Sequence, residues 1–163
     1  WTIWGTTGVW QLGTWYATSR STALWGRGEN FASDSSVRSK AIKIPATGKT
    51  WLAFRDSTNL QLWNQAVEGG VVEYATGPTG PWKDLGSKFV AGKYDGPILS
   101  GFGNPLQGRK AFTGMSYGFE VSKAELTFLK GKTVYLRFRL ATNADTTSFD
   151  GWVIDDVRVY QCK

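Results

Sequence analysis

Hydrophobic and polar positions alternate along much of this chain, most regularly over residues 134–140. The apolar residues of that segment are Val134, Leu136, Phe138 and Leu140. They recur with a period of two, which is the pattern of a β-strand with one buried face. The sequence therefore predicts a strand here, with these four side chains in the core and Tyr135, Arg137 and Arg139 on the opposite face.

The same period, interrupted by turn residues, predicts further strands and very little helix. Strands are expected at residues 50–55 and 71–75, and weaker ones at 8–12, 37–44 and 118–121. Residues 123–130 have helical propensity but span barely two turns, so they fit a short helix or a loop. Short strands without crossover helices are typical of antiparallel sandwiches, and the predicted fold class is all-β, an antiparallel two-sheet jelly-roll sandwich.

The C-terminal segment alternates in the same way until two adjacent carboxylates interrupt it. Asp155 and Asp156 stand between Ile154 and Val157, where the pattern predicts a buried strand. Carboxylates in such a place need a cation, backbone donors or water. Two interpretations stay open: a calcium site, since Ca²⁺ prefers oxygen ligands, or a strand end whose carboxylates cap a neighbouring loop.

Composition indicates a single domain over residues 1–163. The chain is 41% hydrophobic and carries 20 glycines, which suits a real core with many turns. No apolar run approaches the roughly 20 residues of a membrane span. The chain opens on Trp1 rather than Met, so we expect a piece cut from a longer or processed chain. The one cysteine, Cys162, is either a free thiol or the partner of a cysteine elsewhere in the parent chain.

The net charge of +6 is dispersed along the sequence. A dispersed basic balance favours solubility and attracts polyanions only weakly. No nucleic-acid motif accompanies it, so no nucleic-acid partner is predicted.

Most common catalytic devices are missing. The chain has no histidine, which excludes a Ser-His-Asp triad and His-ligated zinc, and one cysteine cannot build a thiolate site. Paired carboxylates could in principle serve glycoside hydrolysis, but nothing singles out a pair. We therefore predict that the domain is not an enzyme.

Aromatic residues are abundant, with 9 Trp, 9 Phe and 6 Tyr. Trp15, Tyr16 and Trp25 lie near the N-terminus among polar residues such as Thr14 and Thr18, which suits a loop. Such rings can stack on sugars or insert at a protein interface, and we take these three as the candidate ligand-binding residues. The alternative is that most of the aromatic residues fill the core.

Two further stretches are distinctive, the Gly-Asn-Pro-Leu-Gln-Gly-Arg run at 103–109 and the Gly-Trp-Val-Ile-Asp-Asp-Val run at 151–157. Together with the β pattern of nearly the whole chain, they resemble the MAM-like jelly-roll domain that is appended to secreted bacterial metallopeptidases of the immune inhibitor A type. The resemblance implies a non-catalytic, extracellular jelly roll of a bacterial exported protein, often carrying calcium. The zinc motif of the peptidase is absent, so protease activity is not implied.

The resemblance also implies a second contributor to the calcium site. The loop at residues 26–35 corresponds to one that lies near the C-terminal strand in that family. Its candidate ligands, in addition to Asp155 and Asp156, are Asp34, Asn30 and Glu29. The rival interpretation is that Arg27, Arg38 or an arginine on a strand neutralises the aspartate pair without a metal.

Two functions fit these observations. The first is a recognition module that binds a glycan or a cell-surface protein through aromatic and polar loops. The second is a structural accessory domain that packs on other domains of the parent chain, such as a secreted peptidase, and stabilises them. A jelly roll can serve either role, so fold alone does not choose.

Overall fold

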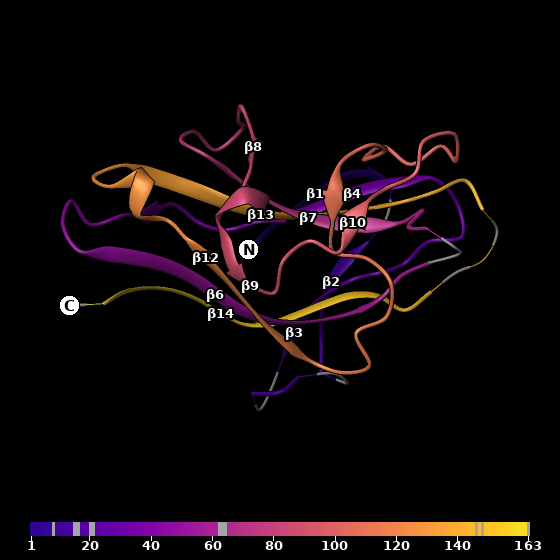
Figure 1. The fold of residues 1–163 in the computed structure, drawn as a ribbon, viewed down its shortest axis with the longest axis horizontal. Helices are drawn as coiled ribbons and strands as arrows, with labels where there is room; N and C mark the ends of the chain where they lie inside the picture. The colour runs from indigo at the N-terminus through magenta and orange to yellow at the C-terminus, as the bar shows by residue number, and fades with distance from the viewer. Residues whose placement is uncertain are drawn as a thin grey trace.

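The computed structural model describes residues 1–7, 9–14, 17–19, 22–61, 65–145, 147 and 149–162. Strands form two large antiparallel sheets that face each other, as the two layers in Figure 1 show. No α-helix occurs among the described residues. The predicted all-β, two-sheet sandwich is confirmed.

The first sheet contains, in spatial order, β1 (Thr2–Thr7), β4 (Ser33–Arg38), β13 (Thr133–Thr142), β7 (Gly69–Ala75) and β8 (Lys83–Asp84), with β5 (Ile42–Lys43) paired to β13. The second contains β2 (Trp10–Gly13), β3 (Ala23–Gly26), β14 (Gly151–Cys162), β6 (Lys49–Asn59), β12 (Glu120–Glu125) and β9 (Phe89–Ala91). A small hairpin of β10 (Gly96–Pro97) and β11 (Lys110–Ala111) and two 3₁₀ turns, Gly86–Lys88 and Thr127–Leu129, complete the described elements.

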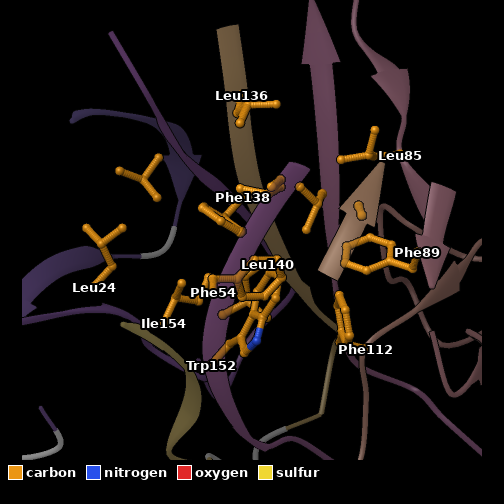
Figure 2. Packing of buried hydrophobic residues seen from close by; sticks show 14 of the residues in the cluster. Leu24, Phe54, Leu85, Phe89, Phe112, Leu136, Phe138, Leu140, Trp152 and Ile154 are labelled. Carbon is orange, nitrogen blue, oxygen red and sulfur yellow. The ribbon is translucent and has the colours of Figure 1, made fainter. Parts of the chain in front are cut away.

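The core lies between the sheets and is rich in aromatic rings (Figure 2). The predicted face of β13 is confirmed, because Val134, Leu136, Phe138 and Leu140 are all fully buried. From the second sheet, Trp152 packs on Phe138 with ring centroids 5.6 Å apart. Edge-to-face pairs of this kind add to the free energy of burial.

Glycine at position 70 is required by this packing. A Cβ there would lie 2.3 Å from Cε3 of Trp152, well inside van der Waals contact. The Gly69–Gly70 pair at the start of β7 therefore lets the first sheet approach the indole ring from the second sheet.

Two local predictions need correction. Residues 123–130, expected to form a short helix or a loop, begin as strand: β12 runs to Glu125 in register with β6, and a 3₁₀ turn follows it. Cross-strand pairing outweighs the weak helical propensity of a two-turn segment. The single strand expected at 37–44 is two, since β4 ends at Arg38 and β5 begins at Ile42.

A β-bulge explains why the alternation breaks at the aspartate pair. The pairing of β14 with β6 shifts between Asp155 and Arg158, and Asp156 has a φ of 52°. Trp152 and Ile154 face the core before this shift, and Val157 and Val159 pack against the core after it. One extra residue thus keeps both halves of the strand in phase with the core.

Candidate functional site

The outer face of the first sheet carries a hollow of about 190 Å³. It is lined by Trp4, Ser36, Arg38, Pro78, Thr79, Trp82 and Arg137. Arg38 and Arg137 are cross-strand neighbours on β4 and β13, and Trp4 on β1 is opposite Ser36. The alternation that buries one face of β13 therefore directs its polar side chains to this site.

Aromatic rings and guanidinium groups are in contact across the hollow. The Cζ of Arg38 lies 5.5 Å from the ring centre of Trp4 and 5.3 Å from that of Tyr135. The Cζ of Arg137 lies 4.4 Å from the ring centre of Trp82. Cation–π contacts like these fix the orientation of both partners, so flat apolar surfaces and hydrogen-bond donors lie side by side.

Carboxylates neutralise three arginines beside the hollow. Glu73, which is buried, accepts hydrogen bonds from Nε of Arg137 and from Nη1 of Arg109 at 2.7 Å. Asp84 accepts from the same Arg109. Asp34 holds both Nε and Nη2 of Arg139, and these hydrogen bonds raise the pKa of Arg139 above its ordinary value. This network makes the floor of the face rigid and almost neutral.

Arg38 differs from its neighbours. It forms no ion pair within the described residues; its Nη1 donates to the carbonyl of Pro78, and its buried Nε has no hydrogen-bond partner. The hollow therefore contains one positive charge that no carboxylate in the described part of the chain balances. A ligand that brings acceptor oxygens would satisfy it.

The aspartate pair of β14 has donors around it. Asp155 accepts hydrogen bonds from Thr18 N at 2.7 Å, from Thr18 Oγ1 at 2.9 Å, and from the N–H groups of Ser19 and Asp156 at 3.1 and 2.7 Å. Burial raises the pKa of Asp155, but these hydrogen bonds outweigh burial and hold the pKa below its ordinary value. Asp156 lies near Arg55 and Arg158, at 3.7 and 3.4 Å. The described partners thus fit the loop-capping and strand-arginine interpretations, and calcium binding by this pair stays a prediction.

The other predicted calcium ligands lie apart from the pair. Asp34 is on the first sheet, bound to Arg139. Glu29 is buried near Arg27 at 3.7 Å, and Asn30 is exposed. Their loop packs against the start of β14, because a Cβ at Gly28 would meet Gly151 N at 3.3 Å. That point is four residues, about 13 Å of extended strand, before Asp155.

The predicted ligand-binding aromatic residues are only partly covered by the structure. Trp15 and Tyr16 lie outside the described residues. Trp25 is half-buried on β3, and its indole N–H donates to the carbonyl of Asp150.

Sequence reasoning missed Trp82 and Arg38 as site residues. The sequence did contain a signal for this face, because Tyr135, Arg137 and Arg139 were predicted to point outward from the same strand. What the sequence could not supply is the pairing order that places β4 and β1 beside β13.

Comparison with family models finds no match, and no curated protein matches the chain. Solved structures do match. One is TmCBM61 in complex with β-1,4-galactotriose, with a TM-score of 0.56 and 10% identity over 99% of this chain and 88% of that one. Another is the glycoside hydrolase domain of Endo-D from Streptococcus pneumoniae R6, with a TM-score of 0.52 and 18% identity over 95% of this chain but only 21% of that one.

The K1 cleaved adhesin domain of Lys-gingipain from Porphyromonas gingivalis W83 matches at a TM-score of 0.47 and 12% identity, over 99% of both chains. That score is too low to carry an argument. At these identities the first two matches establish a shared β-sandwich fold. The link to metallopeptidase-associated MAM-like domains stays a prediction.

Proposed function

We propose that this domain is a non-catalytic, extracellular recognition module that binds a glycan in the hollow formed by Trp4, Arg38 and Trp82. The observation that carries the proposal is the pairing of two tryptophan rings with guanidinium groups on a rigid sheet face. Aromatic rings stack on the apolar faces of sugars, while arginine donates to their oxygens.

The size of the hollow suits one sugar unit. Sites that enclose a drug-sized ligand measure about 300–1,000 Å³, whereas this hollow measures about 190 Å³. The remainder of a glycan chain would lie across the outer face of the sheet. Support for sugar binding by this fold comes from TmCBM61, which was solved with β-1,4-galactotriose.

The unbalanced charge of Arg38 favours an acidic sugar. The carboxylate of a uronic acid can accept two parallel hydrogen bonds from a guanidinium group, and the net charge of +6 adds a weak general attraction. We therefore expect tighter binding of uronic-acid oligosaccharides than of neutral galactotriose.

Titration calorimetry with both sugars tests the proposal. Trp82→Ala should weaken binding about fivefold, which is about 1 kcal/mol for one stacked ring. Arg38→Gln should remove the preference for the acidic sugar and leave ring stacking in place.

Tyr160→Ala is the matched control, because Tyr160 also contacts a cation, Lys123, at 5.8 Å but belongs to the second sheet. If Tyr160→Ala or Trp25→Ala weakened sugar binding and Trp82→Ala did not, the binding site would lie outside the hollow. No binding of either sugar would overturn the proposal.

A second candidate is the accessory role. Trp1, Ile3, Val9 and Leu12 are exposed apolar residues at or beside β1 and β2, the edge strands of the two sheets. Such a strip suits a neighbouring domain of the parent chain. The isolated domain should then self-associate in sedimentation, and Ile3→Ser with Leu12→Ser should abolish that association.

A further inference from the structure

Buried oxygen atoms without donors gather at one end of the sandwich. Glu68 is fully buried, its Oε2 accepts from Gln61 N at 2.9 Å, and its Oε1 has no hydrogen-bond partner among the described residues. The side-chain oxygens of Gln61 and Asn143 also have no hydrogen-bond partner among the described residues, and each of these residues is only 1% exposed. Orphaned buried acceptors are rare and need an explanation.

Several contacts show that these groups are neighbours. Gln61 Nε2 donates to Asp145 Oδ2 at 2.8 Å, and the backbone N–H of Asn143 reaches the Glu68 carboxylate. Burial, with a smaller contribution from the negative charge of Asp145, raises the pKa of Glu68 to about 7, although the hydrogen bonds from Gln61 and Asn143 lower it. The residues that carry two carboxylates and two side-chain amides are thus neighbours where β6 and β13 end and β7 begins, and these strand ends lie at the right of Figure 1.

No arginine or lysine in the described part of the chain pairs with Glu68. A single proton on Glu68 would satisfy one orphaned acceptor and leave another unpaired. A cation would satisfy all of them together and offset both negative charges.

We propose that Gln61, Glu68, Asn143 and Asp145 bind a hard divalent cation, Ca²⁺ in the first place. Calcium takes six to eight oxygen ligands from carboxylates, amide carbonyls, backbone carbonyls and water. The donor set here contains only oxygen, which fits Ca²⁺ and excludes a thiolate or imidazole site. The described residues hold no cluster of three His, Cys, Asp or Glu, so this site depends on its amide oxygens.

The loop before β4 reaches the same end of the molecule. Thr142, directly before Asn143, donates from Oγ1 to the carbonyl of Phe31 at 2.6 Å. No hydrogen bond of the described residues joins that loop to Asp155. The two candidate sites share no residue, so calcium bound at Glu68 would occupy a site separate from the one predicted at Asp155 and Asp156.

Thermal melts and titration calorimetry test the site without any glycan, so the result is independent of the proposed function. After chelator dialysis, millimolar Ca²⁺ should raise the melting temperature by roughly 5–10 °C if it reaches about 100 times its dissociation constant. Calorimetry with CaCl₂ should give one site per chain.

Glu68→Gln, which keeps the shape and removes a charge, should abolish the shift. Asp155→Asn is the matched control and should keep it. If Glu68→Gln fails to fold, Asp145→Asn is the second variant and should weaken calcium binding at least tenfold. The proposal is overturned if the wild-type protein shows no shift, or if the shift survives Glu68→Gln and disappears in Asp155→Asn.

Discussion

Asp155 and Glu68 are both buried carboxylates, yet their surroundings are opposite. Asp155 faces donors from Thr18, Ser19 and Asp156, and its pKa is lowered. Glu68 lies beside the carboxylate of Asp145, its own Oε1 has no hydrogen-bond donor among the described residues, and burial raises its pKa to about 7. The adjacent aspartates are conspicuous in the sequence, yet hydrogen-bond donors surround Asp155. Glu68 is inconspicuous in the sequence, yet one of its buried oxygens has no donor among the described residues.

The largest loss of stability is expected in the hydrophobic core between the two sheets. Phe138 lies on β13, is fully buried, and contacts Phe54 and Trp152 at ring distances of 5.1 and 5.6 Å. Phe138→Ala should lower the free energy of unfolding by about 3–5 kcal/mol through lost burial and a cavity. Urea denaturation measures this, and a loss below about 1 kcal/mol would contradict the described packing.

A third carboxylate gives a sharper electrostatic test. Asp56 is buried, and burial raises its pKa from 3.8 to about 6 although Ser122 and Trp152 donate to it. The fold therefore prefers the protonated form, and stability should fall as pH rises from about 4 to about 6. A shift of about two units corresponds to about 3 kcal/mol.

Asp56→Asn should remove that fall in denaturant melts taken across the pH range. Asp155 should act in the opposite direction. Its stabilising contribution is present above its ordinary pKa of 3.8 and is lost as pH falls through the lower value it has in the fold. An Asp56→Asn protein that keeps the wild-type pH profile would show that Asp56 is ionised in the fold at low pH.

Replacing Asp155 or Glu68 by its uncharged amide should change the free energy of unfolding in opposite directions. In calcium-free buffer, Asp155→Asn should lower the free energy of unfolding by about 2 kcal/mol, because charge-assisted acceptors for several donors are lost. Glu68→Gln should raise it by about 1–2 kcal/mol, because a buried, unpaired charge is removed. Equal losses in both variants, measured by urea denaturation, would mean that Glu68 is as well satisfied as Asp155.

The strands were predictable where one face is buried. The alternation at 134–140 specified β13 and its core face, and Trp152 and Ile154 are buried as expected for the C-terminal strand. The bulge was visible only as a break in the period, which the sequence could not distinguish from a metal site. A bulge and a metal site both place carboxylates in a strand. Only the residues that contact Asp155 in three dimensions, such as Thr18, distinguish the two interpretations.

The candidate sites were less predictable, because each depends on strand order. Trp4 and Trp82 are 78 positions apart in the sequence, and they meet because β1, β4, β13 and β7 are adjacent in the first sheet. Glu68 follows an unremarkable Ala-Val pair and is buried only because β6 and β13 end at the same place. Periodicity reports which face of a strand is buried, but not which distant strand covers it.

The position of β14 has a consequence for how the chain is made. This last strand lies in the interior of the second sheet, between β3 and β6, and pairs with β6 through Cys162. During synthesis from the N-terminus, β3 and β6 have no partner on their facing edges until residues 151–162 emerge. Until then the nascent domain exposes two unpaired strand edges, which makes it dependent on protection from aggregation until β14 has been made.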